Sequence, residues 1–169
     1  MSIRPCREDE RGAILEIVNA AAEVYRGVIP DDCWHEPYMS ARELDAEIAA
    51  GVRFWAYELD AAAALGVMGV QPKADVDLIR HAYVRPGSQR SGIGGALLRH
   101  LQGMTGRRVL VGTWAAADWA IDFYRRHGFE LVTAQRKDEL LRTYWDIPDR
   151  QIETSVVLAS PPFGRAPGG

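Results

Sequence analysis

The chain has 169 residues, a net charge of −3 and 47% hydrophobic residues. This length is typical of one domain, and the composition is that of a globular chain. The slightly acidic charge gives no general reason to bind nucleic acid or an anionic membrane, so neither is expected as a partner. No apolar run approaches the roughly 20 residues that span a bilayer, and the first residues lack a signal peptide's apolar stretch, so a cytoplasmic protein is expected. The two cysteines, Cys6 and Cys33, predict neither a disulfide framework nor a metal site.

Helical and strand patterns alternate in the order strand, helix, helix, three strands, helix, strand, helix, two strands. Apolar stripes with a period of 3.6 indicate the helices, and β-branched or alternating runs indicate the strands. Ser40 and Glu43 have the spacing of a capping box for the second helix. A tight turn at Asp60-Ala61 predicts a hairpin. The expected strands cover 3–6, 52–59, 64–71, 75–84, 108–114, 129–134 and 152–158, and the expected helices cover about 9–25, 40–51, 93–104 and 117–127.

Two further segments have different compositions. Residues 135–151 are charged with embedded aromatic residues and are too long for a hairpin turn, so they predict a functional loop or a short helix. Residues 160–169 contain three prolines and three glycines, which is typical of a solvated tail. The chain is therefore predicted to form a single domain over residues 1–159 and a tail over residues 160–169.

The most informative stretch joins the strand that ends at Val84 to the next helix. Gly92, Gly94 and Gly95 lie at the start of that helix. Glycine there lets a ligand approach the backbone, and the free N–H groups with the helix dipole attract anions, so the loop is predicted to hold a phosphate. The third glycine of the dinucleotide pattern G-x-G-x-x-G is missing, and the Gly-Lys-Ser/Thr of the nucleoside triphosphate loop occurs nowhere in the chain.

This loop resembles the coenzyme A pyrophosphate loop of the GCN5-related N-acetyltransferases (GNAT), whose signature is Q/R-x-x-G-x-G/A. Here it reads Gln89-x-x-Gly92-x-Gly94-Gly95-Ala96, preceded by Tyr83-Val84-x-Pro86. A glycine-rich turn that only starts a helix could carry the loop pattern alone. However, a second family segment, A-x-x-F-Y-x-x-x-G-F, is matched by Ala120-Ile121-x-Phe123-Tyr124-x-x-x-Gly128-Phe129.

The resemblance extends over about residues 2–158 and implies the fold of that family. This is an α/β (α+β) architecture, the GNAT fold, with a mixed central sheet of six to seven strands and about four flanking helices. A splayed pair of parallel strands, ending at Val84 and at Trp114, would hold the coenzyme. The resemblance also implies acetyl-CoA as co-substrate and no metal. The sequence leaves open whether the chain forms a homodimer.

The resemblance assigns coenzyme contacts to the strand end and the loop. Backbone groups at Ala82 and Val84 would pair with the pantetheine arm, and the Val84 N–H would polarise the thioester carbonyl. Arg85 and Arg90 are candidates for the 3′-phosphate, or else solvated surface charges. The expected coenzyme-binding residues are Ala82, Tyr83, Val84, Gln89, Arg90, Ser91, Gly92, Ile93, Gly94, Gly95, Ala96, Ala117 and Tyr124.

The catalytic candidates are Tyr124 and His81. In the family, the tyrosine at the position of Tyr124 reaches the coenzyme sulfur, so it is the expected general acid. The strand over 75–84 has no glutamate, and His81 is its only side chain that titrates near neutral pH, so it is the expected base. Strand alternation puts Asp77 on the face of His81 and Arg80 on the other face. A bulge would instead bring Arg80 inward and suggest an acidic group on the substrate.

The acceptor is expected to be a primary amine of a small molecule, an amino acid or a peptide. It would bind among the first two helices, their connecting loop and residues 135–151. The carboxylates of Asp31, Asp32 and Glu36 could attract a cationic amine. The candidate substrate residues are Tyr25, Trp34, Asp77, Arg80 and Tyr144. The alternative function is a non-catalytic acyl-CoA binding or sensing module on the same fold, which the absent strand glutamate leaves open.

Overall fold

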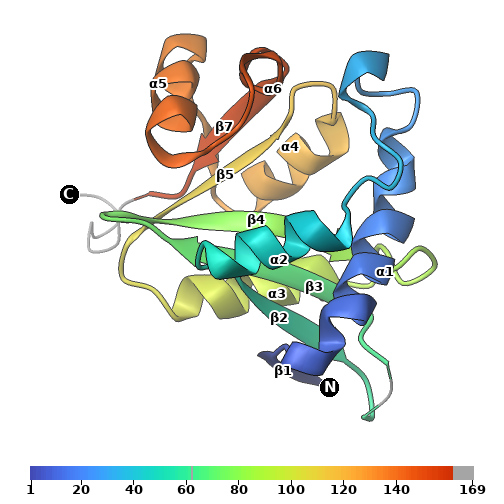
Figure 1. Cartoon of the computed structure of the whole chain (residues 1–169). Helices are drawn as coiled ribbons and strands as arrows, with labels where there is room; N and C mark the ends of the chain where they lie inside the picture. The colour runs from blue at the N-terminus through green and yellow to red at the C-terminus, as the bar shows by residue number, and fades with distance from the viewer. Residues whose placement is uncertain (62, 162–169) are drawn as a thin grey trace.

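The computed structural model describes residues 1–61 and 63–161. Its strands form one mixed sheet in the order β1-β2-β3-β4-β5-β7-β6 (Figure 1). All neighbouring strands are antiparallel except β4 and β5, which run parallel. The strands are β1 (Ser2–Pro5), β2 (Arg53–Glu58), β3 (Gly66–Pro72), β4 (Val76–Val84), β5 (Arg108–Trp114), β6 (Glu130–Leu131) and β7 (Ser155–Ala159). This is the mixed sheet that the family resemblance implies.

Helices cover both faces of the sheet. On one face, α1 and α2 pack on the half formed by β2 to β4, and α5 and α6 pack on the half formed by β4, β5 and β7. On the opposite face, α3 and α4 pack behind the sheet as Figure 1 shows it. The helices are α1 (Arg11–Ala22), α2 (Ala41–Ala49), α3 (Ile93–Gly103), α4 (Asp118–Arg126), α5 (Ala134–Tyr144) and α6 (Asp149–Glu153). No helix in the described part of the chain has the length and apolar character needed to cross a bilayer.

The apolar stripes that predict the helices become their buried faces. Ile17 and Val18 of α1 and Leu44 of α2 are fully buried in one cluster, and Leu97 and Leu101 of α3 are buried in the opposite one. The cap predicted for α2 is present, because the Ser40 hydroxyl accepts the Glu43 N–H at 3.1 Å.

Strand β4 contains a bulge. Met68 of β3 faces both His81 and Ala82 of β4, which is the two-against-one arrangement of a β-bulge. The extra residue is accommodated by His81, whose φ of 55° lies in the left-handed region. Gly69 allows the close approach beside it, since an added Cβ would lie 2.8 Å from the Arg80 carbonyl oxygen.

The bulge changes which β4 side chains share a face. Arg80, His81 and Tyr83 all line the face covered by α1 and α2, whereas Asp77 lies on the opposite face. The regular alternation that groups Asp77 with His81 and opposes them to Arg80 is therefore wrong. The open alternative, in which a bulge brings Arg80 inward, describes the structure.

The parallel strands β4 and β5 separate part-way along their length. They pair only from Val76 to Ile79 on β4 and from Arg108 to Val111 on β5. Beyond this point β4 continues beside β3, and β5 continues beside β7. The two strands thus form a fork, which is the splayed pair that the resemblance implies.

The C-terminal part of the chain differs from prediction in its boundaries. The strand expected over 129–134 is reduced to β6, because the Thr133 side chain accepts the Arg136 N–H at 3.2 Å and starts α5. Helix α5 occupies most of the segment expected to be a loop or short helix, since Leu140 and Leu141 bury against the sheet. Ile152, expected to begin the last strand, belongs to α6.

The first residue of the predicted tail belongs to the sheet. Ser160 is buried, its N–H donates to the Val109 carbonyl at 2.9 Å, and its hydroxyl accepts the Val109 N–H at 2.9 Å. Ser160 therefore continues the sheet rather than opening a solvated segment. Residues 162–169 of the predicted tail lie outside the described residues.

Candidate active site

A groove of about 970 Å³ follows the fork on the side of α3 and α4. The end of β4 (82–84) lines its base, and the glycine loop with the start of α3 lines one wall. Phe123 and Tyr124 of α4 line the other wall, and Tyr25 closes the groove from the α1 side. A volume of this size is at the upper end for small-molecule and cofactor sites.

The glycine loop forms one end of this groove. Gly92 precedes α3 with a φ of 81°, a conformation that favours glycine. The N–H groups of Ile93, Gly94 and Gly95 belong to the first turn and have no carbonyl partner within the helix. No acidic side chain occupies that turn. The loop end therefore suits an anion, as the sequence predicts.

Basic side chains surround the same end. Besides tyrosines, the charged or titratable residues in the groove lining are Arg90, Arg99, Arg126, His127 and Asp122. His127 donates from Nδ1 to the Phe123 carbonyl at 2.8 Å, and a Cβ at position 95 would lie 2.8 Å from its Nε2, so Gly95 makes room for this ring. Arg85, the other phosphate candidate, lies outside the lining and pairs with Glu16 at 2.5 Å.

The free edge of β4 faces the groove. The Arg85 N–H donates to the Leu65 carbonyl at 2.8 Å, and hydrogen-bonding directions alternate along an antiparallel strand. The Val84 N–H and carbonyl therefore point away from β3 and into the fork. The Gln89 side chain donates to that carbonyl at 3.3 Å. The Val84 N–H can donate to a carbonyl oxygen of a bound molecule.

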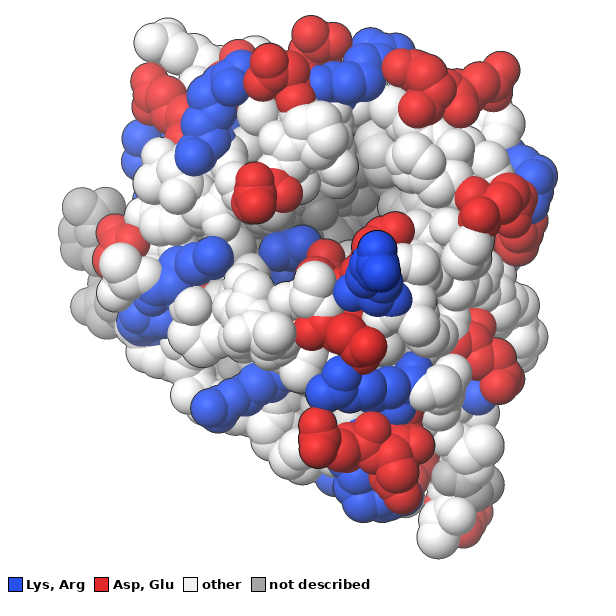
Figure 2. All heavy atoms as spheres, viewed as in Figure 1, with Lys and Arg blue, Asp and Glu red and all other residues white. Residues whose placement is uncertain are grey.

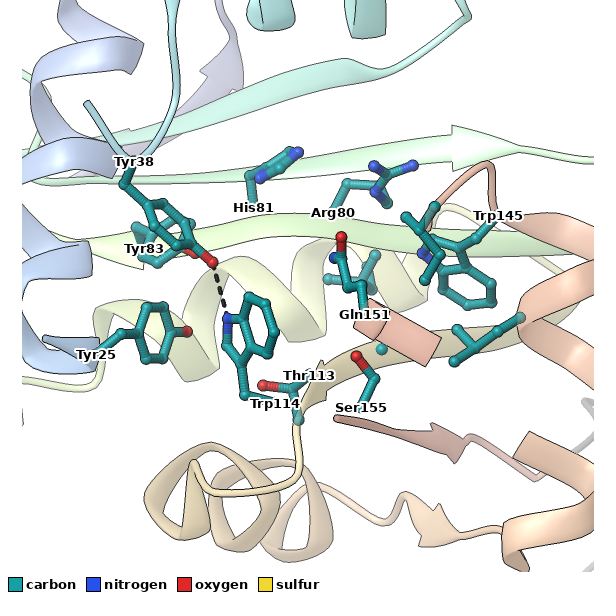
Figure 3. A pocket seen from close by; sticks show the side chains of 14 residues that line it. Tyr25, Tyr38, Arg80, His81, Tyr83, Thr113, Trp114, Trp145, Gln151 and Ser155 are labelled. Atoms are coloured by element: carbon teal, nitrogen blue, oxygen red, sulfur yellow. Dashed lines mark hydrogen bonds between the residues drawn. The ribbon is translucent and has the colours of Figure 1, made fainter. Parts of the chain in front are cut away.

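A second cavity, of about 110 Å³, lies on the opposite side of the fork, and we call it the acceptor cavity (Figure 3). Figure 2 shows the face seen in Figure 1 as hollowed, with mostly uncharged walls and charged groups around the rim. Tyr25 and Tyr83 line both this cavity and the groove, so the two spaces meet at the fork. In the same wall, the Trp114 indole N–H donates to the Tyr38 hydroxyl at 2.9 Å.

The tyrosines of the acceptor cavity are poor proton acceptors. Burial raises the pKa of Tyr25 to about 12. Burial also raises the pKa of Tyr38, and it raises that of Tyr83 well above the ordinary value, with a further contribution from the two neighbouring hydroxyls. All three hydroxyls keep their protons at neutral pH, so they can hydrogen-bond a substrate without serving as its base.

His81 is held by Glu47 of α2. The His81 Nε2 contacts one carboxylate oxygen of Glu47, and Arg80 donates to the other at 2.9 Å. Burial raises the pKa of Glu47, but the interactions with His81 and the charge of Arg80 outweigh it, so the pKa lies below its ordinary value. The left-handed backbone of His81 costs on the order of 1–2 kcal/mol, and such strain is concentrated at functional sites.

Tyr124 lies where the groove approaches the fork. Its ring is 5% exposed and packs against Phe129 with centroids 5.6 Å apart. Burial, with a smaller contribution from Tyr25, raises the pKa of Tyr124 far above its ordinary value. The side chain therefore retains its proton and can donate a hydrogen bond to an atom in the groove.

Residues 50–131 match the family described as an acetyltransferase (GNAT) domain. This range includes β4, the glycine loop and the aromatic segment of α4. The match covers just under half of the chain and identifies a GNAT domain within it. No curated protein matches the sequence.

Solved GNAT structures share the fold over nearly the whole chain. The ribosomal-protein-S18-alanine N-acetyltransferase from Escherichia coli has a TM-score of 0.69 and 17% identity, with 99% of this chain and 97% of that chain covered. The PaiA N-acetyltransferase from Thermoplasma acidophilum, in complex with coenzyme A, has a TM-score of 0.68 and 16% identity, with 95% and 99% covered. At these identities the likeness establishes the fold.

Most coenzyme residues expected from the GNAT resemblance line the groove, and three do not. Ser91 is exposed and its hydroxyl donates to the Ser88 carbonyl. Ala96 lies on α3 outside the lining. Ala117 is fully buried just before α4. The residues that do line the groove are Ala82, Tyr83, Val84, Gln89, Arg90, Gly92, Ile93, Gly94, Gly95 and Tyr124.

Two of the expected acceptor residues, Tyr25 and Arg80, line the acceptor cavity, together with the expected base His81. Asp77 does not, because it lies on the other face of the sheet. Its carboxylate accepts a hydrogen bond from Arg107 at 2.6 Å. This pair ties β4 to the start of β5 and leaves Asp77 remote from the acceptor.

Trp34 and Tyr144 also lie outside the cavity lining. The Trp34 indole donates to Glu36 at 2.9 Å, and the Tyr144 hydroxyl donates to Asp75 at 2.6 Å. The residue after Tyr144, Trp145, faces the cavity in its place. The sequence correctly indicated the segment but not the side chain that the end of α5 would direct inward.

Several site residues were missed. Glu47 sits beside Leu44 and Ile48 on a helix whose buried face was predicted, and a carboxylate at the edge of that stripe was the available signal. Arg99 and Arg126 follow the glycine loop and the aromatic segment by about one helical turn. Nothing in the local sequence signals that Gln151 and Ser155 line the acceptor cavity, because their positions depend on α6 and β7.

Proposed function

We propose that this protein is an acetyl-CoA-dependent N-acetyltransferase that transfers the acetyl group to a primary amine by direct attack in a ternary complex. One observation carries the proposal: the groove and the acceptor cavity meet at Tyr25 and Tyr83 in the fork. Two substrates bound on opposite sides of the sheet would therefore touch at one point. This arrangement suits direct transfer, because it holds the reacting groups together.

The groove fits coenzyme A in shape and charge. The N–H groups from Gly92 to Gly95, with Arg90 and Arg126, would hold the phosphates. Acetyl-CoA supplies the acetyl group as an activated thioester. The Val84 N–H, directed into the fork, would bind the thioester oxygen as negative charge develops on it. A single such donor contributes about 10²–10³-fold to the rate in other enzymes.

The remaining roles fall to His81 and Tyr124. The amine nitrogen forms a bond to the carbonyl carbon, the carbon–sulfur bond breaks, and the amine proton passes to His81 directly or through water. Glu47 would stabilise the positive charge that His81 acquires. Tyr124 would donate its hydroxyl hydrogen bond to the departing sulfur. Because its pKa is far above ordinary, hydrogen bonding contributes more than full proton transfer.

A thiol-release assay with acetyl-CoA and a panel of primary amines tests the proposal. We expect release that depends on the amine, with an acetylated product found by mass spectrometry. His81→Ala should lower the rate at least about 10²-fold while coenzyme binding persists. His100→Ala is the matched control, because the His100 ring packs against Trp55 with centroids 4.9 Å apart and lines neither cavity.

Two outcomes would contradict the proposal. Tight coenzyme binding without amine-dependent release across a broad panel would favour the non-catalytic acyl-CoA binding module. Equal rates for the wild type and His81→Ala would remove His81 from the reaction.

A further inference from the structure

The lining of the acceptor cavity contains no carboxylate in the part of the chain that the structure describes. Two carboxylates expected to attract a cationic amine are engaged elsewhere: Asp32 pairs with Arg150 at 2.8 Å and Glu36 pairs with Arg26. Glu47 lies behind Arg80 and His81 rather than in the lining. An ammonium group would therefore find no anionic partner in this cavity.

The two ends of the cavity differ in chemistry (Figure 3). The end at the fork is aromatic, with hydroxyls that can hydrogen-bond a neutral amine. Its residues are Tyr25, Tyr38, Tyr83 and Trp114. The other end, which we call the polar end, contains Arg80 of β4, Gln151 of α6 and Ser155 of β7, and the Trp145 ring lies beyond them.

At the polar end, several hydrogen-bond donors have no partner among the described residues. Arg80 donates from Nη1 to Gln71 at 3.0 Å and from Nη2 to Glu47 at 2.9 Å, which fixes the guanidinium and leaves its other N–H groups without a partner among the described residues. The Gln151 amide and the Ser155 hydroxyl likewise make no side-chain hydrogen bond within residues 1–61 and 63–161. One carboxylate, Glu47, contacts both Arg80 and His81 here.

We infer that the acceptor carries a carboxylate close to its amine, and is thus of the amino acid class. The Arg80 guanidinium and the Gln151 amide would bind the carboxylate, and the amine would lie at the tyrosine end beside the thioester. Arginine presents forked donors that match a carboxylate. The cavity of about 110 Å³ suits a molecule of this size. This inference rests on the proposed function and narrows its acceptor.

The test compares matched acceptors. Each α-amino acid is assayed beside its primary amide and beside the amine that lacks the carboxylate, by thiol release from acetyl-CoA. We expect kcat/KM for the amino acid to exceed both by at least about 10-fold, because the polar end has nothing else to pair with. An aminoalkyl phosphonate completes the panel, and a preference for it over the carboxylate would overturn the inference.

Two variants test whether Gln151 and Arg80 cause the preference for amino acids. Gln151→Leu should raise KM for amino acids about 10-fold and KM for the amides by less, and since the Gln151 side chain has no partner among the described residues, the fold should tolerate it. Arg80→Gln should remove the preference entirely. Arg42→Gln is the matched control, because Arg42 is an exposed arginine on α2 without an ion pair among the described residues.

The outcomes separate this inference from the proposed function. Amides and simple amines turned over as well as amino acids would overturn the inference and leave the acetyltransferase proposal standing. If no amine is turned over, the proposed function fails. Titration of amino acids and amides into coenzyme-saturated protein then decides the inference, since selective binding of the amino acid supports it and equal or no binding overturns it.

Discussion

Removal of the Tyr124 hydroxyl should lower the reaction rate without affecting the stability of the fold. In Tyr124→Phe the ring remains, with its contacts to Phe129 at 5.6 Å and Phe123 at 5.0 Å between centroids. The Tyr124 hydroxyl makes no hydrogen bond to another residue that the structure describes. Its loss therefore leaves no buried group unpaired, and we expect the free energy of unfolding to change by less than about 1 kcal/mol.

The effect on rate should be far larger. Positioned proton donors contribute about 10²–10⁴-fold. Burial raises the pKa of Tyr124 so far that full proton transfer is unfavourable, which places its contribution near the lower limit. We expect kcat to fall about 100-fold, or about 2.7 kcal/mol of transition-state stabilisation, with coenzyme affinity unchanged.

The assay is single-turnover thiol release, with thermal unfolding and coenzyme binding measured on the same samples. Tyr144→Phe is the control, because its hydroxyl donates to Asp75 at 2.6 Å and lies outside both cavities. That variant should retain the wild-type rate. A kcat for Tyr124→Phe within twofold of the wild type would refute the assigned role.

Two further predictions concern stability. The Arg4 hydrogen bond holds the pKa of Glu10 at about 2, below its unfolded value, so the stabilisation is complete above about pH 4.5 and is lost as pH falls toward 2. Glu10→Gln should lower the free energy of unfolding in urea by about 1–2 kcal/mol at pH 7, allowing for solvent screening, and by almost nothing near pH 2. Gly69→Ala should cost about 1–3 kcal/mol, because its Cβ would lie 2.8 Å from the Arg80 carbonyl oxygen and 2.9 Å from Val52. Gly12→Ala is its control and should stabilise by up to about 1 kcal/mol, since nothing lies within 4 Å of an added Cβ on α1.

Each stability prediction has a result that contradicts it. For Glu10→Gln, it is an equal loss of stability at pH 7 and at pH 2, which would mean that the carboxylate charge is not responsible. For Gly69→Ala, it is wild-type stability with wild-type kcat. The β3–β4 register would then have room for a side chain beside the bulge.

The donor side was predictable because its signals are local. Gly92, Gly94 and Gly95 follow one strand and start one helix, so consecutive residues specify the anion site without knowledge of the rest of the fold. The resemblance of the Phe123-Tyr124 segment to a GNAT family segment then predicted a second wall of the groove. Alternation within β4 was wrong because the bulge depends on the partner strand, where Gly69 permits the close approach.

The acceptor side depends on long-range placement. Arg80, Gln151 and Ser155 are distant in sequence and meet only after β4, α6 and β7 assemble. Helix α5 was predicted only as one of two alternatives, a loop or a short helix, for a related reason. Its fully buried residues are only Leu140 and Leu141, a stripe too narrow to stand out within a charged segment.

The bulge connects the two sides of the proposed reaction. In an unbroken strand, His81 and Tyr83 would share a face with Ile79 and point toward α3 and α4, where their rings would occupy the groove. The extra residue of the bulge reverses the faces toward which the side chains after it point. The small side chains of Ala82 and Val84 now face the α3–α4 side, and the two rings face the acceptor. The same backbone irregularity would therefore clear space for the coenzyme and supply the proposed base and part of the aromatic wall. The costly left-handed conformation of His81 would thus serve both halves of the proposed reaction.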